Sequence, residues 1–208
     1  MILDRPMSAR NRRPAPASPL RRLLPLLALV GLALAGWLLW QTWRGVDDTR
    51  YHSEIAVAAR RHGIDPELVR AVIWQESRFD AAAVGGAGEI GLMQILPGGA
   101  VAEWARIMRC PAPPERQLFR PEVNLEIGCF YLARALRRWS GYKYGTALAL
   151  AQYNAGESRA KTWAPETRDG EVVPRIRIAS TKKYVETIVK RYRKYLCERS
   201  GGKRSGGK

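Results

Sequence analysis

Residues 65–79, DPELVRAVIWQESRF, predict an amphipathic helix with one face in a protein core. Asp65 followed by Pro66 is typical of a helix start, because Asp accepts free N–H groups of the first turn and Pro suits the first helical position. Apolar residues then recur at spacings of three and four, which places them on one face. This stripe consists of Leu68, Val69, Val72, Ile73 and Phe79. We expect the helix to run to about Arg78.

Glu76 lies on the apolar face of this predicted helix, four residues after Val72 and three after Ile73. A carboxyl group there is partly removed from water, so we expect its pKa to rise. A raised pKa suits a general acid that works near neutral pH. The simpler interpretation is a glutamate that reaches solvent or caps a backbone group at the helix end. Position alone favours that simpler interpretation.

The chain from Tyr51 onward has helical periodicity. Segment 172–178 is the one stretch with the alternation of a strand. The glycine-rich stretch 85–91 predicts a loop, and it lacks the Lys of a phosphate-binding motif. Further helices are predicted at 54–62, from 97, and at 123–139, 146–153 and 180–197. The pattern indicates an all-α domain of about 150 residues.

Three sequence blocks carry a resemblance to a known family. They are Glu76-Ser77-Arg78-Phe79 with Ala83-Val84-Gly85 and GEIGLMQILP at 88–97; Asn124, Gly128, Tyr131 and Leu132; and AQYNAG at 151–156 with Tyr184-Val185 after it. In this order and spacing, the sequence resembles the soluble lytic transglycosylase domain, glycoside hydrolase family 23, and the goose-type lysozymes that share its fold. The resemblance spans residues 51–197 and implies a lysozyme-like all-α fold.

The resemblance implies a reaction with a single catalytic carboxyl group, which corresponds to Glu76. This group would protonate the glycosidic oxygen between N-acetylmuramic acid and N-acetylglucosamine in peptidoglycan glycan strands. It would then accept the proton of the muramic 6-hydroxyl, which attacks the anomeric carbon and leaves a 1,6-anhydromuramic end. Most glycosidases need two carboxylates, whereas here the substrate supplies the nucleophile. No cofactor and no metal are expected.

Five further residues are expected to bind substrate by the same resemblance. Met93 and Gln94 would line the sugar groove beside the acid, and Tyr153 and Asn154 would lie across it. The Tyr153 hydroxyl would bond the catalytic Glu or the substrate, and Tyr184 would contribute from the last helix. Taken singly, Met93 and Tyr153 suit core packing, and Asn154 suits helix termination.

Gly85 departs from the family, in which many members have a Ser that can bond the acid or the substrate. That contact is therefore missing or is supplied elsewhere. Asp80 and Glu89 are the nearest other acids, and neither is expected to be a committed partner of Glu76. A muramidase-type hydrolase, which must hold a water molecule, would require one of them. Ser77 is not expected to be a nucleophile.

Residues 23–40 contain no charged or strongly polar side chain. A helix that crosses a bilayer needs about 20 apolar residues, and residues 41–43 extend the run into the interface. Trp37, Trp40 and Trp43 suit an aromatic belt, and the excess of Arg before the run predicts that the N-terminus lies in the cytoplasm. We expect a membrane anchor here.

The predicted organisation has four parts. A basic cytoplasmic tail at 1–22 precedes a transmembrane anchor at 23–43, a catalytic domain at 44–199 and a disordered basic tail at 200–208. The enzyme would sit in the cytoplasmic membrane, with its catalytic domain on the periplasmic or extracytoplasmic side. A cleaved signal peptide is the alternative, because Ala33-Leu34-Ala35 matches a cleavage site. It would leave a soluble periplasmic domain.

The formal net charge of +16 implies an anionic partner. Clustered Lys and Arg at 182–194 are typical of nucleic-acid binding, but export disfavours nucleic acid. Peptidoglycan carboxylates and anionic lipid head groups suit the charge equally well. An exported domain also permits a disulfide between Cys110 and Cys129, although both cysteines suit simple burial.

Two functions besides transglycosylation stay open at this point. One is a hydrolase, in which water attacks in place of the 6-hydroxyl. The other is a non-catalytic module that only binds glycan. A single anchor near the wall also suits a partner in cell-wall or secretion machinery.

Overall fold

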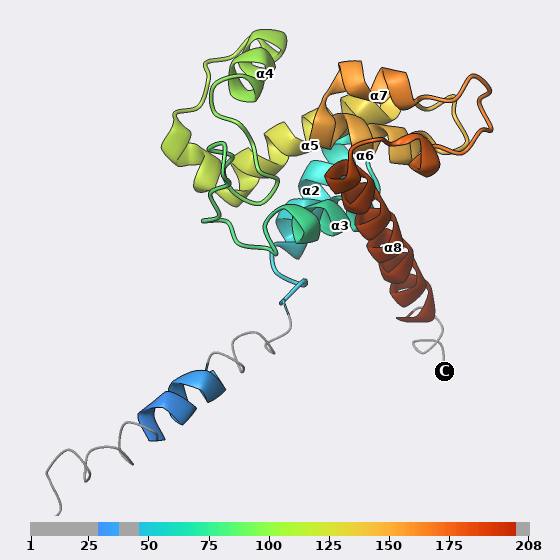
Figure 1. Cartoon of the computed structure of the whole chain (residues 1–208). Helices are drawn as coiled ribbons and strands as arrows, with labels where there is room; N and C mark the ends of the chain where they lie inside the picture. Colours follow the sequence, from blue (N-terminus) through green and yellow to red (C-terminus); the bar gives the residue numbers. More distant parts are fainter. Residues whose placement is uncertain (1–28, 38–45, 203–208) are drawn as a thin grey trace, which may run out of the picture. The chain divides into compact units, whose positions relative to one another are not determined.

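A computed structural model describes residues 29–37 and 46–202, which belong to two compact units (Figure 1). In the first unit, residues 29–37 form a helix. None of the helices in these ranges combines the length and the apolar character that crossing a membrane requires. The predicted tail at 1–22, and residues 23–28 and 38–43 of the predicted anchor, lie outside the described residues.

The second unit is built from helices and loops. Its elements are α2 (His52–His62), α3 (Pro66–Glu76), α4 (Ala100–Met108), the short 3-10 helix η1 (Glu115–Phe119), α5 (Pro121–Arg138), α6 (Gly145–Ala155), α7 (Glu157–Trp163), the 3-10 helix η2 (Val173–Arg175) and α8 (Ala179–Gly202). Within residues 46–202 no strand forms, and two isolated bridges join Ile90 to Val84 and to Ile95. The predicted all-α class is confirmed for this part of the chain.

Helix α6 is the centre of the core. Residues 147–151 are buried in succession, so the helix is covered on every side. It packs against α5, α7 and α8, while α3 lies between α2 and α8 (Figure 1). The long helix α8 therefore contacts both the central helix and the helix that carries Glu76.

Helix α3 begins where the sequence predicts, because the Asp65 side chain accepts the N–H of Glu67 at 2.9 Å. It ends at Glu76, two residues earlier than predicted. Arg78 and Phe79 follow with φ of 55° and 63°, in the left-handed region that residues with a side chain seldom adopt. This turn returns Phe79 to the core, where it is buried. Glu76 is thereby the last residue of the helix.

Two predicted elements differ from the structure. The strand expected at 172–178 is wrong: Val173–Arg175 form the short helix η2, in which Pro174 has no N–H to donate to a neighbouring strand. The helix expected to open at Pro97 begins three residues later, at Ala100, after a turn.

Helix α8 is longer than predicted. It continues past Cys197 to Gly202, so the first residues of the tail predicted as disordered at 200–208 are helical. The Ser200 hydroxyl donates to the carbonyl of Leu196 at 2.9 Å, and Lys194 pairs with Glu198 one turn later. These contacts support the extra turn. Residues 203–208 lie outside the described residues.

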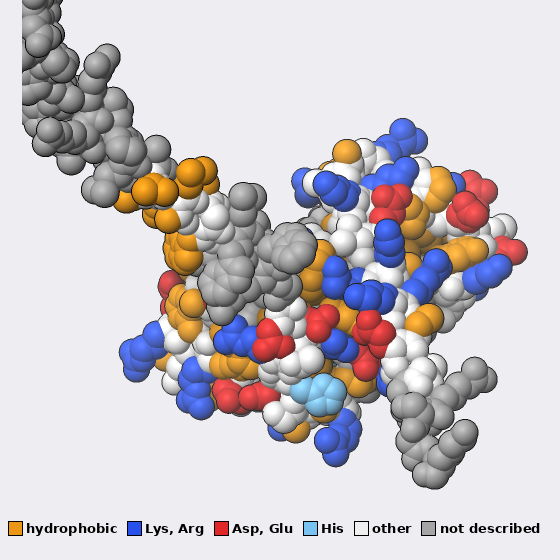
Figure 2. Space-filling model, turned by 90° about the horizontal axis from the view of Figure 1, so that it is seen from below, with side chains coloured by type: hydrophobic (Ala, Val, Ile, Leu, Met, Phe, Trp, Pro, Cys, Tyr) orange, Lys and Arg blue, Asp and Glu red, His pale blue; other side chains and the backbone are white. Residues whose placement is uncertain are grey.

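The surface of the second unit mixes charges of both signs, as the face in Figure 2 shows. On α8, Arg199 forms an ion pair with Asp65, and Arg191 stacks on the Trp74 ring, 3.2 Å from its centre.

The three cysteines are free thiols, so the possible disulfide bond between Cys110 and Cys129 is not formed in this structure.

Candidate active site

Glu76 projects from the last turn of α3 toward α8. Its neighbours Val72 and Ile73 are fully buried, and the carboxyl group itself is largely covered. The Tyr184 hydroxyl, from the first turns of α8, donates a hydrogen bond to Glu76 Oε1 at 2.6 Å. None of the ion pairs found among the described residues involves Glu76. A neutral phenol is therefore its polar partner.

Burial raises the pKa of Glu76 to about 7. The hydrogen bond from Tyr184 acts in the opposite direction, while repulsion from the Glu89 carboxylate adds to the rise. Burial, together with the negative charge of Glu76, raises the pKa of Tyr153 and of Tyr184 well above the ordinary tyrosine value, so both stay protonated. Near neutral pH the Glu76 carboxyl group exists in both forms, which suits it to give and to take a proton.

Ser77 anchors the chain directly after Glu76. Its side chain is buried and its hydroxyl donates to the carbonyls of Leu92 at 2.9 Å and of Ile73 at 3.3 Å. This bond joins the end of α3 to the loop that follows the glycine-rich stretch. The hydroxyl is thus committed to structure, as expected of a residue that is not a nucleophile.

The loop at 90–94 is held by Asn124, a fully buried residue of α5. Its amide donates to the carbonyls of Ile90 at 2.7 Å and Leu118 at 2.8 Å, and its oxygen accepts the N–H of Met93 at 2.8 Å. Gly91 has φ of 78°, and a Cβ atom there would overlap the Asn124 amide. Asn124 was part of the sequence resemblance, but its role in shaping the site could not be seen from sequence.

Met93 and Gln94 take different places in this loop. The Met93 side chain is 0% exposed and packs against Gly128, so the expectation that it lines a groove is wrong for that side chain. Its carbonyl instead accepts a hydrogen bond from the Tyr153 hydroxyl at 3.0 Å. Gln94 is half-buried, with φ of 49°, and its amide donates to the carbonyls of Gly91 at 2.9 Å and Ala83 at 3.4 Å.

Tyr153 and Asn154 end α6 on the opposite side of the site. The Tyr153 hydroxyl bonds Met93 and not Glu76, so the direct bond to the acid belongs to Tyr184. Asn154 is exposed and its side-chain oxygen accepts a bond from the Thr181 hydroxyl at 2.8 Å. Thr181, which is buried at the start of α8, had no distinguishing sequence signal.

A cavity of about 180 Å³ lies beside Gln94 and Tyr153. Leu96 also lines this cavity, and 44% of it is exposed. Leu96 was not predicted as a site residue, although it follows Gln94 by two. Hollows of about 480 and 590 Å³ elsewhere contain none of the predicted site residues.

Asp80 and Glu89 have distinct surroundings. Asp80 is exposed, and its carboxylate accepts the N–H of Ala82 at 2.9 Å, as in a turn. The Glu89 carboxylate folds back over Gly85, in the space that a side chain at residue 85 would occupy. Across residues 29–37 and 46–202, no group of three or more His, Cys, Asp or Glu is placed to hold a metal ion.

The family model described as the Transglycosylase SLT domain matches residues 53–172. The X polypeptide of Escherichia coli is 35% identical to this chain over 105 residues, which cover 48% of this chain and 57% of that protein. Membrane-bound lytic murein transglycosylase C of Histophilus somni is 37% identical over 84 residues, 40% of this chain and 23% of that protein. The chain thus spans less than two thirds of the length of these relatives.

Two solved structures share the fold. The lytic transglycosylase Slt of Pseudomonas aeruginosa, solved as an inactive mutant with Gln in place of a Glu, matches with a TM-score of 0.62 and 29% identity, over 69% of this chain and 23% of that one. The 70 kDa soluble lytic transglycosylase of Escherichia coli matches with a TM-score of 0.64 and 25% identity, over 75% and 26%. The predicted lysozyme-like helical fold of this type is confirmed.

Proposed function

Because the chain belongs to the transglycosylase SLT domain family, we propose that it is a lytic transglycosylase that cuts the glycan strands of bacterial peptidoglycan. One observation carries this proposal: Glu76 is a largely buried carboxyl group with a phenol partner, no ion pair among the described residues and a pKa near 7. Such a group can act first as acid and then as base at neutral pH.

The proposed reaction uses Glu76 twice. Its proton passes to the glycosidic oxygen as the bond from that oxygen to the anomeric carbon of N-acetylmuramic acid breaks. The muramic 6-hydroxyl then forms a bond to the same carbon and gives its proton to Glu76. The acid is regenerated, a 1,6-anhydro end is formed and no water is consumed.

The proposed substrate contacts come from the loop that contains Gln94 and from the last turn of α6. Gln94 and Asn154 offer polar groups, and Leu96 offers an apolar surface beside the cavity at Tyr153. Tyr184 keeps Glu76 in place through its hydrogen bond. Met93 contributes through its carbonyl, which orients Tyr153. A mutant relative in which Gln replaces a Glu is inactive, which agrees with dependence on one carboxyl group.

We also propose that residues 23–43 anchor the enzyme in the cytoplasmic membrane, with the catalytic domain on the periplasmic or extracytoplasmic side and residues 1–22 in the cytoplasm. The apolar run with Arg before it supports this topology, and several relatives are named membrane-bound. Fractionation of cells that make the full chain tests the proposal. Release of the protein in a form shortened near Ala35 would favour the cleaved-signal alternative.

Product analysis tests the proposed reaction. Purified peptidoglycan sacculi are incubated with the wild type and with Glu76→Gln, and the soluble products are identified by mass spectrometry. We expect anhydromuramic ends from the wild type and none from the variant. Products heavier by one water would instead identify a hydrolase. Glycan binding without any product would identify a non-catalytic binding module.

A further inference from the structure

Gly85 leaves room for a second carboxylate in the candidate active site. A Cβ atom at this position would overlap Glu89 Oε2 and would lie 2.6 Å from Gln94 Oε1. Gly85 is not among the glycines with positive φ, so its backbone would accept other residues. The missing side chain, and not an unusual backbone, is what the site requires here.

Two oxygen atoms face this gap, and backbone contacts hold both. The Glu89 carboxylate accepts the N–H of Ala87 at 3.0 Å, and the Glu89 carbonyl accepts the N–H of Gly85 at 2.8 Å. The Gln94 amide nitrogen donates to the carbonyls of Gly91 and Ala83, so the oxygen is the Gln94 atom that points to Gly85. Both oxygens are acceptors, and neither can satisfy the other.

The charge of Glu89 acts on the acid. Three titratable groups face Glu76: Tyr184 from α8, Tyr153 from α6 and Glu89 from the loop. Of these, Glu89 is the one that brings a negative charge. No ion pair among the described residues offsets it. The Glu89 carboxylate is half-buried and accepts one N–H, so it keeps free lone pairs that, together with the Gln94 oxygen, can accept from a bound proton donor.

We propose that Glu89 Oε2 and Gln94 Oε1 bind an N–H or O–H group of the amino sugar that reacts at Glu76, and that the Glu89 charge stabilises the positive charge of its transition state. The inference rests on the proposed function and names the chemical group bound beside the acid. Cleavage of a glycosidic bond passes through an oxocarbenium-like transition state, and a fixed negative charge nearby lowers its energy. Glu89 forms and breaks no bond itself.

The variant Glu89→Gln tests the charge, because it keeps the size of the side chain and one acceptor oxygen. We expect kcat on purified glycan strands to fall about ten- to hundredfold. The alkaline limb of the rate profile should also move to lower pH, because the repulsion that raises the pKa of Glu76 is lost. Glu166→Gln, an exposed glutamate far along the chain, is the matched control and should change neither value.

The variant Gly85→Ala tests the gap, because its methyl group must displace Glu89 Oε2 and also crowd Gln94 Oε1. We expect a loss of kcat at least as large as that of Glu89→Gln, and little further loss when both changes are combined, since both act on one contact. Unchanged kcat and pH profile in Glu89→Gln, or additive losses in the double variant, would overturn the inference. A wild type that releases no product would instead overturn the proposed function as well. Thermal unfolding of each variant checks its folding.

Discussion

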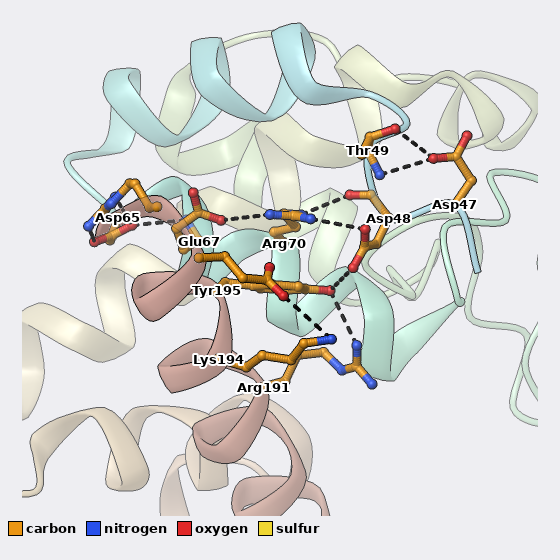
Figure 3. Close-up of polar contacts among 11 residues, drawn as sticks. Asp47, Asp48, Thr49, Asp65, Glu67, Arg70, Arg191, Lys194 and Tyr195 are labelled. Carbon is orange, nitrogen blue, oxygen red and sulfur yellow. Dashed lines mark hydrogen bonds and ion pairs between the residues drawn. The ribbon is translucent and has the colours of Figure 1, made fainter. Parts of the chain in front are cut away.

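The two ends of helix α3 hold carboxylates in opposite ways, although both ends face α8. At the first turn, Arg199 of α8 donates two hydrogen bonds to Asp65, at 3.0 and 3.1 Å. Arg70 donates one to Glu67 at 3.1 Å (Figure 3). At the last turn, Glu76 receives one bond from a neutral tyrosine. One end is an ion-pair network, and the other holds Glu76, an acid without a cation partner among the described residues.

Arg70 connects the paired end to the segment before α2. It donates to the side chain of Asp48 at 3.0 Å and to its carbonyl at 2.8 Å, and its guanidinium lies 3.9 Å from the centre of the Tyr195 ring. The Tyr195 hydroxyl donates to the other Asp48 oxygen at 2.7 Å (Figure 3). Although burial acts to raise it, the pKa of Asp48 is lowered by the bonds from Tyr195 and Arg70. The same balance lowers the pKa of Asp65, chiefly through Arg199.

Helices α3 and α8 together thus hold carboxylates of two kinds. Desolvation acts on all of them, and the outcome depends on whether a cation lies within bonding distance. Helix α8 supplies Arg199 near one end of α3 and the phenol of Tyr184 at the other. The partners that α8 presents at the two ends, a guanidinium and a phenol, thus contribute to stability at one end and to reactivity at the other.

The largest expected effect is on catalysis. Glu76→Gln removes the proton donor, and we expect activity on sacculi to fall about a thousandfold or more, equivalent to about 4 kcal/mol. Glu67→Gln, at the paired end of the same helix, is the control. It should retain activity while it unfolds more easily. Equal losses of activity in the two variants would erase the functional distinction between the ends.

The next effect is on stability: Glu76→Gln, which should lose activity, should gain stability at alkaline pH. The pKa of Glu76 is raised from the ordinary 4.5 to about 7 in the folded state. The folded protein therefore binds this proton more tightly than the unfolded chain, and stability falls as pH rises from about 4.5 to about 7. Glu76→Gln escapes this cost and should be about 3 kcal/mol more stable than the wild type at pH 8. The two proteins should be equally stable at pH 4, as urea unfolding at both pH values can check.

Removal of Arg70, the cation that pairs with both Asp48 and Glu67, should lower the stability of the folded protein. Arg70→Met leaves Asp48 and Glu67 without their partner, and we expect a loss of about 2 kcal/mol, because the pairs are partly exposed. The lowered pKa of Asp48 adds a pH test: its contribution is present above its ordinary pKa and is lost as pH falls below it. The wild type should therefore lose more stability than the variant on acidification. Parallel unfolding curves at pH 7 and pH 3 would contradict this.

The smallest effect concerns Tyr184, whose hydroxyl donates to Glu76. Tyr184→Phe removes the bond that favours the charged form of Glu76, so the pKa of Glu76 should rise further. We expect the alkaline limb of kcat/KM to move up by less than about one pH unit, or under about 1.4 kcal/mol. Tyr153→Phe loses only a bond to a backbone carbonyl and serves as the comparison. If the alkaline limb of the kcat/KM profile moves to lower pH in Tyr184→Phe, the hydrogen bond from Tyr184 does not lower the pKa of Glu76.

Local sequence predicts the parts of this site that depend on helix periodicity. The Asp65 cap, the buried stripe and the place of Glu76 among apolar neighbours all follow from spacing within one helix. The early end of α3 does not, because it depends on the bond from Ser77 to the Leu92 carbonyl and on the burial of Phe79 in the core, which spacing within one helix does not reveal.

Partners across the fold were harder to predict. Tyr153 and Tyr184 belong to different sequence blocks, and which hydroxyl reaches Glu76 depends on how α6 and α8 pack. Met93 was expected in a groove, but the close approach of Gly128 encloses its side chain. The sequence indicated a missing Ser side chain at Gly85, but it did not indicate that the Glu89 carboxylate fills the space.

Asn124 also sets an order in which the site can assemble. Its amide fixes the backbone at Ile90 and Met93, yet it lies more than thirty residues later in the chain. Such long-range contacts form after local helices during folding. With residues 1–22 kept in the cytoplasm, as the proposed anchor requires, the exported domain crosses the membrane starting from the residues next to the anchor, so Glu76 emerges before Asn124, which holds the loop beside it. The proposed enzyme would then be inactive while it crosses the membrane, and would become active only once α5 has packed against the loop at residues 90–94.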